Sequence, residues 1–150
     1  MTEIIRVPNI EDYIQEIING ELILTPKYQY ISKEDLQRTK LKYSSIIKCN
    51  IKNNKDNTIS NSKKSYKDIL IDIWVSMPTQ QILQNTSFNL KLTNENGKKG
   101  YIWCEKIKMS IQNRDADNTI KEILHMLVVN NYNIKISIKL ENGIVICLKI

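Results

Sequence analysis

The chain has 150 residues, a length typical of one domain, and its composition of 41% hydrophobic and 25% charged residues excludes an intrinsically disordered chain. Lys and Arg number 22 against 16 Asp and Glu, and the net charge of +6 is a reason to consider nucleic acid as a partner. Only three of these basic residues are Arg, while Ile, Lys and Asn, all encoded by AT-rich codons, dominate the chain. Codon usage is therefore an alternative cause of the charge.

The reactive residues are few. Cys49, Cys104 and Cys147 have neither the spacing of a zinc site nor that of a disulfide framework, and His125 is the single histidine. The chain contains no run of 18 apolar residues and does not begin like a signal peptide. We therefore expect a cytoplasmic protein with no membrane association, no metal and no cofactor.

The clearest early element that the sequence predicts is an amphipathic helix over residues 9–19. Asn9 is a favourable N-cap, the aliphatic residues after it recur at helical spacing, and Gly20 is a typical stop. Residues 21–25 are then predicted as a strand that Pro26 ends.

Three more elements are expected before the middle of the chain. Residues 27–31 are predicted as a short strand, and Ser32 as the N-cap of a surface helix. Residues 45–51 alternate between apolar and polar side chains, which predicts a strand. Its buried face would hold Ile47, Cys49 and Ile51.

The segment 52–65 is polar and has no period, which predicts a flexible loop within a single domain spanning residues 1–150. After it, every second residue from Ile69 to Val75 is aliphatic, which favours a strand. Pro78 is expected to open a short helix.

Two Asn-Gly pairs predict hairpins in the second half. Asn96-Gly97 suits a two-residue type I′ turn between strands 88–93 and 101–111, which would place Leu90 opposite Trp103.

A two-residue loop at Asn142-Gly143 would instead set the aliphatic face of one strand against the polar face of the other. A three-residue loop with Gly143 in the left-handed region of a G1 bulge removes that conflict. Four aliphatic couples then face each other: Leu140 with Ile144, Ile138 with Ile146, Ile136 with Leu148, and Ile134 with Ile150.

A helix over residues 118–129, capped by Asp115 or Asp117, is expected between these hairpins. Its buried stripe would contain Ile120, Ile123, Leu124, Leu127 and Val128, with Lys121, Glu122 and His125 facing solvent. The elements together predict an α+β fold, an antiparallel sheet of β-hairpins and meanders with three or four helices packed on it.

No set of residues has the spacing of a nucleophile–base pair or a phosphate-binding loop, so no catalytic residue is predicted. Aromatic residues beside lysines are instead typical of surfaces that hold single-stranded nucleic acid. The candidates are Tyr28, Tyr30, Trp74, Lys98, Lys99, Trp103 and Glu105. The polar face of the last hairpin is basic too, through Lys135, Lys139 and Lys149.

Glu105 interrupts an apolar strand face, so it lies either at the rim of the sheet or at a bulge near Cys104. Asp68 and Asp72 are a further pair of carboxylates four residues apart.

The chain is rich in Ile, Lys and Asn, for example in the segments NGELILTPKYQYIS and KLTNENGKKGYIW. In this respect the whole chain resembles uncharacterised short proteins of giant amoeba-infecting DNA viruses of the mimivirus kind. The resemblance implies a virus-encoded protein that works in the host cytoplasm or in a viral factory. It carries no catalytic residue to this sequence.

Two functions are compatible with these observations. The first is a non-enzymatic interaction module that binds a protein partner, with a homo-oligomer as a further option. The alternative is an RNA- or single-strand-binding domain that uses lysines and aromatic residues on a sheet face. An enzyme would need a pocket that holds Glu105 or Asp72 with a second acid or a metal.

Overall fold

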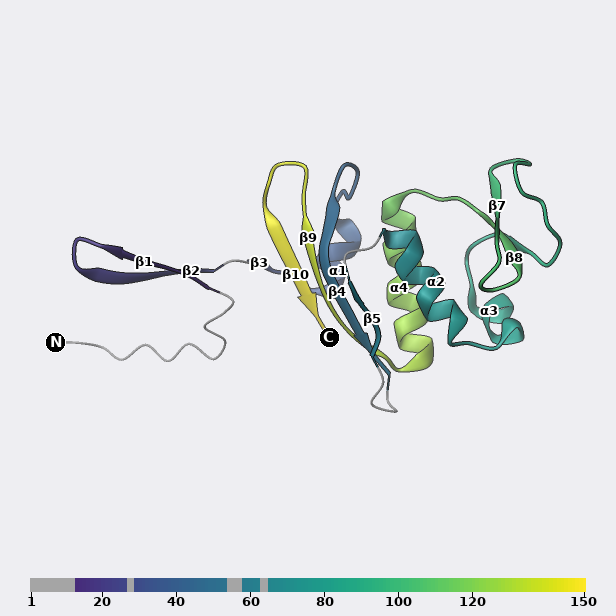
Figure 1. Cartoon of the computed structure of the whole chain (residues 1–150), viewed down its shortest axis with the longest axis horizontal. Helices are drawn as coiled ribbons and strands as arrows, with labels where there is room; N and C mark the ends of the chain where they lie inside the picture. Colours follow the sequence, from purple (N-terminus) through teal and green to yellow (C-terminus); the bar gives the residue numbers. More distant parts are fainter. Residues whose placement is uncertain (1–12, 27–28, 54–57, 63–64) are drawn as a thin grey trace.

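The computed structural model of the chain describes residues 13–26, 29–53, 58–62 and 65–150 (Figure 1). Helices and mostly antiparallel strands form an α+β fold in this part, as the sequence predicts. The strands are β1 (Tyr13–Ile18), β2 (Glu21–Pro26), β3 (Gln29–Tyr30), β4 (Ser45–Lys52), β5 (Thr58–Ser62), β6 (Leu90–Lys91), β7 (Tyr101–Cys104), β8 (Met109–Gln112), β9 (Asn133–Lys139) and β10 (Val145–Lys149). The helices are α1 (Lys33–Arg38), α2 (Tyr66–Val75), α3 (Thr79–Asn85) and α4 (Ala116–Asn130).

The layers are built around a five-stranded sheet with the order β3-β10-β9-β4-β5, in which β3 runs parallel to β10. Helices α2 and α4 lie together on one side of this sheet (Figure 1). The three-stranded sheet β6-β8-β7 lies beyond them with α3, and the separate β1–β2 hairpin projects away on the opposite side (Figure 1).

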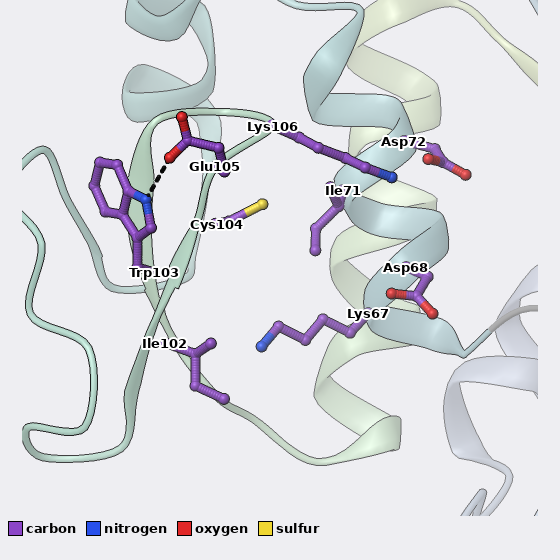
Figure 2. Close-up of a pocket in the computed structure, with 9 residues that line it drawn as sticks. All are labelled: Lys67, Asp68, Ile71, Asp72, Ile102, Trp103, Cys104, Glu105 and Lys106. Carbon is purple, nitrogen blue, oxygen red and sulfur yellow. Dashed lines mark hydrogen bonds between the residues drawn. The ribbon is translucent and has the colours of Figure 1, made fainter.

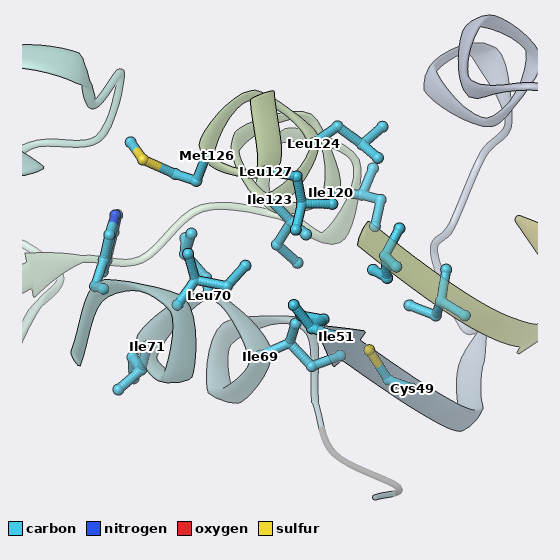
Figure 3. Close-up of a cluster of buried hydrophobic side chains, with 14 of the residues drawn as sticks. Cys49, Ile51, Ile69, Leu70, Ile71, Ile120, Ile123, Leu124, Met126 and Leu127 are labelled. Carbon is cyan, nitrogen blue, oxygen red and sulfur yellow. The ribbon is translucent and has the colours of Figure 1, made fainter. Parts of the chain in front are cut away.

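The hydrophobic core lies between the five-stranded sheet and the two helices. Figure 3 shows Ile51 of β4 pointing toward Ile69 of α2, while Ile123 and Leu127 of α4 point toward the same space. Because side chains alternate along a strand, burying this face turns the intervening residues of each strand to the other side of the sheet.

The C-terminal hairpin confirms the predicted three-residue loop. Gly143 has a φ of 88°, and its amide donates to the Leu140 carbonyl at 2.9 Å. Ile138 lies opposite Ile146, as burial of both faces requires. The other predicted couples also face each other: Leu140 with Ile144, Ile136 with Leu148, and Ile134 with Ile150.

Helix α4 is confirmed, with a correction to its buried face. Asp115 is the N-cap, and its Oδ1 accepts from the Asn118 amide at 2.8 Å. Val128, expected inside, is 64% exposed, whereas Glu122, expected in solvent, is 2% exposed. The chain after α3 contacts the Glu122 side of the helix, and this contact moves the buried face toward Glu122 and away from Val128.

The caps of the two short helices are also as expected. The Ser32 hydroxyl accepts from the Asp35 amide at 3.1 Å at the start of α1, and α3 follows Pro78.

The helix predicted for residues 9–19 is wrong where the structure describes it, because Tyr13–Ile18 is the strand β1. Asn19 and Gly20 have φ values of 52° and 82° and join β1 to β2 in a two-residue turn. Left-handed values at both central positions are those of a type I′ turn, for which Asn-Gly is the favoured pair. Residues 9–12 lie outside the described part.

The strand predicted for residues 69–75 is wrong as well, because these residues belong to helix α2. Ser65 caps the helix and accepts from the Asp68 amide at 3.1 Å. The segment is so rich in apolar residues that it satisfies the period of a strand and that of a helix together. Ile69, Leu70, Ile73 and Trp74 are four of the five buried residues of α2, and they have helical spacing.

The hairpin expected at Asn96-Gly97 takes another form. Residues 101–111 are two strands, β7 and β8, which pair with each other, and β6 pairs with β8 instead of β7. The expected pairing of Leu90 with Trp103 is therefore wrong, since Leu90 lies opposite Ile111.

The two-residue turn with left-handed values at both positions occurs three residues later, at Lys99-Gly100 with φ values of 50° and 80°. The Tyr101 amide closes it by donating to the Lys98 carbonyl at 2.8 Å. Glycine at the second position supplies the conformation that the turn needs.

The segment 52–65 contains the strand β5, which pairs with β4. Residues 54–57 and 63–64 lie outside the described part, and the flexibility of this loop stays a prediction. In β4 a register shift between Ile46 and Lys48 buries Ile46 and leaves Ile47 exposed, so Ile47 does not share the face of Cys49 as expected.

Of the helices in the described ranges, none has the length and apolar character needed to cross a lipid bilayer.

Candidate functional site

The side of the five-stranded sheet turned away from α2 and α4 is basic. The polar residues of β4, β9 and β10 alternate with the core residues and therefore share this side. The basic residues on it are Lys48, Lys52, Lys135, Lys139 and Lys149. We call this surface the lysine face.

The register brings these lysines together from distant parts of the sequence. Asn50 lies opposite Lys135, and Lys135 lies opposite Lys149, so the three form a row across β4, β9 and β10. Lys52 and Asn133 form the next row. Neighbouring strands are about 4.8 Å apart, which places these side chains within reach of one ligand.

The strands β4, β9 and β10 contribute five lysines to this face and contain no Asp or Glu. Five lysines on one surface nearly equal the net charge of +6 of the whole chain. A surface of one sign attracts polyanions and raises their local concentration.

The centre of the lysine face is closed and polar. Ser137 donates to the Cys147 sulfur at 3.7 Å, and both side chains are buried. Tyr30 of β3 lies opposite Cys147 at the sheet edge and is exposed. The face therefore offers ammonium groups around a closed centre, with one aromatic ring at its margin.

A pocket of about 350 Å³ opens at one end of the lysine face. Its lining residues are Asn50, Lys52, Asn133, Ile134, Lys135, Lys149 and Ile150. The side-chain oxygen of Asn50 is buried and accepts no hydrogen bond. The pocket is therefore lined by three lysines, two asparagines and two isoleucines.

A second concave region is a cleft of about 520 Å³ between α2 and β7 (Figure 2). Lys67 and Lys106 extend into it from α2 and from the turn after β7, and the Cys104 thiol points inward (Figure 2). Asp68 and Asp72 lie on the helix wall. The cleft therefore presents both signs of charge.

The structure brings Trp103 and Glu105 together at the rim of this cleft. The Trp103 Nε1 donates to Glu105 Oε2 at 2.8 Å (Figure 2). Lys108 pairs with the other carboxylate oxygen of Glu105. Of the two interpretations of Glu105, the exposed rim position is the one that the structure shows, because the residue follows β7 in a turn. The described residues include no cluster of three His, Cys, Asp or Glu that could hold a metal ion.

Trp74 is a core residue and is not available to a ligand at the surface. Its ring is 1% exposed and packs edge-to-face on Phe88, with ring centroids 5.7 Å apart. A base could stack on Trp74 only if the core opened, so Trp74 and Trp103 do not form a pair around one ligand.

The remaining predicted residues are dispersed. Lys98 and Lys99 lie in the turn before β7, where Lys98 is 3.7 Å from Glu95. The hydrogen bond from Thr93, aided by the charge of Lys98, lowers the pKa of Glu95 below its ordinary value. Tyr30 adjoins the lysine face, and Tyr28 lies outside the described residues.

The alternation of residues 45–51 and the basic polar side of the last hairpin each signal half of the lysine face. What sequence reasoning missed is that β4 lies beside β9, which adds Lys48, Lys52 and Asn50 to that surface.

Compared with protein-family models, with curated proteins and with solved structures, the chain gives no significant match.

Proposed function

We propose that the protein binds single-stranded nucleic acid on the lysine face. The observation that carries this proposal is the gathering of five lysines on three adjacent strands that contain no Asp or Glu. Lysine ammonium groups bind phosphates as point charges, and a row of them can follow a flexible sugar-phosphate chain. The exposed ring of Tyr30 offers a stacking platform at the margin.

The proposal predicts an affinity that depends steeply on salt, because each neutralised phosphate releases counterions. With five lysines engaged, the logarithm of the binding constant falls with the logarithm of salt concentration with a slope of about −3.5. Fluorescence anisotropy of a labelled oligouridine in a salt series measures this slope.

A charge-matched pair of variants separates the lysine face from the general charge of the chain. The face variant carries Lys52→Ala, Lys139→Ala and Lys149→Ala, and the control carries Lys40→Ala, Lys42→Ala and Lys121→Ala, all at exposed positions. The face variant is expected to bind about tenfold more weakly or worse, with a shallower salt slope, while the control stays near the parent. Equal losses in both variants, or no binding at low salt, would overturn the proposal.

A protein partner is the second candidate, and the β1–β2 hairpin favours it. Ile17 and Leu22 lie opposite each other on this hairpin and are 77% and 59% exposed. A two-stranded hairpin with exposed aliphatic residues is marginally stable in water by itself, and a partner that covers it would stabilise it.

The test of this second candidate compares affinity capture from infected or native host cells. The parent chain and the lysine-face variant are expected to retain the same protein, and an Ile17→Lys, Leu22→Lys variant is expected to lose it. Capture that ignores the hairpin substitutions would contradict the assignment, and self-association measured by sedimentation would identify a homo-oligomer instead.

We propose that either activity operates in the cytoplasm, of a host cell or of a viral factory if the chain is virus-encoded. The proposal is supported by the three free thiols Cys49, Cys104 and Cys147, since a reducing compartment keeps cysteines in this form.

A further inference from the structure

The β1–β2 hairpin is acidic, in contrast to the lysine face. Residues 13–26 contain Glu16 and Glu21 and no Lys or Arg. Glu21 lies opposite Ile18, and Glu16 lies opposite Ile23. Because side chains two residues apart on a strand share a side, these four lie on one face of the hairpin. This glutamate face combines two exposed carboxylates with two exposed isoleucines.

The lysine face has a complementary patch at the register shift in β4. Ile46 on one side of the shift is buried, and Ile47, the extra residue of the strand, is exposed beside Lys48. Lys139 of the neighbouring strand β9 is exposed as well. We call Ile47, Lys48 and Lys139 the β4 patch. It offers two ammonium groups and one apolar side chain.

The charged pairs of the two surfaces have the same spacing. Glu16 and Glu21 lie on paired strands, two register positions apart. Lys48 lies opposite Ser137, and Lys139 is two positions further along β9. Such diagonal neighbours in an antiparallel pair are about 7–8 Å apart. Two glutamates can therefore meet two lysines when the glutamate face stacks on the β4 patch.

The hairpin does not cover the β4 patch of its own chain, because it projects away from the five-stranded sheet (Figure 1). A two-stranded hairpin is marginally stable in water by itself, so stacking on another sheet would stabilise it. In a dimer with two-fold symmetry, each copy supplies one hairpin and one patch. The contact is then made twice, which doubles the surface that it buries.

We propose that the chain forms a symmetric dimer in which the glutamate face of each hairpin stacks on the β4 patch of the other copy. The dimer covers lysines that the proposed function assigns to nucleic acid, so the two bound states exclude each other. This exclusion rests on the proposed function, whereas the dimer itself does not. Ile17 and Leu22 lie on the opposite face of the hairpin and stay accessible to a protein partner.

Sedimentation velocity of the full chain measures the dimer. At low salt the parent is expected to be monomeric at about 1 µM and dimeric at about 200 µM, because small polar interfaces have dissociation constants on the order of 10 µM. Salt at about 0.5 M is expected to shift the equilibrium toward the monomer, because it screens exposed charges. A parent chain that stays monomeric at the highest concentration would overturn the dimer.

Charge reversal assigns the contact to its residues. The hairpin variant Glu16→Lys, Glu21→Lys and the patch variant Lys48→Glu, Lys139→Glu are each expected to stay monomeric, because like charges meet. An equimolar mixture of the two is expected to dimerise, because each surface then faces its complement. A hairpin variant that dimerises like the parent, or a mixture that stays monomeric, would overturn the assignment.

Two further variants serve as controls. Glu34→Lys, Glu105→Lys makes the same change of net charge at exposed positions outside both surfaces and is expected to dimerise like the parent. Glu16→Gln, Glu21→Gln removes the charges with little change of shape and is expected to weaken the dimer about tenfold. This milder variant keeps the test decisive if a reversed chain fails to fold.

A labelled oligouridine of about 8 nucleotides separates this inference from the proposed function. Added to the dimeric parent at low salt, it is expected to sediment with the monomer. If it binds and the parent never dimerises, the inference is overturned and nucleic-acid binding stands. If the mixture of reversed variants dimerises and the parent binds no oligouridine, the dimer stands and the proposed function falls. Oligouridine bound to an intact dimer would overturn the exclusion.

Discussion

Glu122 shows how one residue can join two parts of this molecule. Its Oε2 accepts three hydrogen bonds, from the Thr86 hydroxyl at 3.0 Å, the Ser87 amide at 2.9 Å and the Ser87 hydroxyl at 2.8 Å. The acceptor lies on α4, and the donors lie just after α3. The carboxylate therefore fixes the chain between α3 and β6 against the central helix.

Glu122→Ala is expected to lower the free energy of unfolding by about 3 kcal/mol, because three part-buried hydrogen bonds are lost and a cavity remains. Glu122→Gln keeps an acceptor oxygen and should lose less. Urea denaturation followed by circular dichroism measures both. The control is Lys121→Ala, at an exposed position on the same helix, with an expected change of about 0.5 kcal/mol or less. A Glu122→Ala variant as stable as this control would contradict the role of the carboxylate.

At the scale of elements, the N-terminus of α4 is sensitive to pH through Asp115. The hydrogen bond from the Asn118 amide, followed by that from the Asn118 side chain, lowers the pKa of Asp115 below its ordinary value. A carboxyl whose pKa is lower in the folded than in the unfolded protein stabilises the fold above the unfolded pKa. That stabilisation is lost as the pH falls through the folded pKa.

The prediction for Asp115 compares the parent with Asp115→Asn, which keeps the cap acceptor and does not titrate. The stability advantage of the parent is expected to be present at pH 6 and to shrink as the pH falls below about 4. Denaturant unfolding at a series of pH values measures the difference. An advantage that stays constant down to the acid limit of folding would contradict the assignment.

The elements also show which sequence signals were sufficient. The C-terminal hairpin was predictable residue by residue, because one register alone buries the aliphatic faces of both strands. Helix α2 was not, since Ile69, Ile71 and Ile73 fit a strand while Leu70 and Trp74 complete a helix stripe. The signal that resolves this ambiguity is the cap at Ser65 with Asp68 three residues later.

The N-terminal error has a similar cause. The aliphatic residues of β1 also have helical spacing, and Gly20 can end a helix as well as form a turn. Gly20 forms an Asn-Gly pair with Asn19 between two apolar segments, and this pattern favours a hairpin.

The candidate site was predictable only in part for a different reason. The strand alternation that puts Lys135, Lys139 and Lys149 on one side is local and readable. The pairing of β4 with β9 joins segments that are far apart in the sequence, and no periodicity of the sequence predicts it. The burial of Trp74 likewise depends on its contact with Phe88, fourteen positions further along the chain.

At the scale of the whole molecule, the β1–β2 hairpin is separate from the layered remainder in its strand pairing. Within the described residues, β1 pairs with β2 alone, and the two form a sheet of their own. Removal of residues 1–26 is therefore expected to change the free energy of unfolding by about 0.5 kcal/mol or less and to leave nucleic-acid affinity intact. Urea denaturation and anisotropy measure these quantities. A substantial loss of stability would mean that the hairpin packs on the remainder.

The distribution of lysines over the molecule bears on whether codon usage alone explains the positive net charge. Codon usage alone would supply lysine wherever a polar residue is tolerated, on every surface of the molecule. The strands β4, β9 and β10 instead hold five lysines and no acid, while the acids are found elsewhere, for example on α1, α2 and α4. The salt slope of binding and the charge-matched variants distinguish a selected surface from a bias of composition.

The pairing of β4 with β9 also determines when the protein can fold during synthesis. Ser45 lies opposite Lys139 of β9, so this end of β4 has its partner strand only after β9 has been synthesised. Until then the inward aliphatic side chains of β4 have only β5 and the early helices as neighbours. The strands β9 and β10, which complete the sheet, are still missing. The centre of this sheet can therefore close only after β9 has left the ribosome, and the unpaired β4 is expected to be prone to aggregation until then.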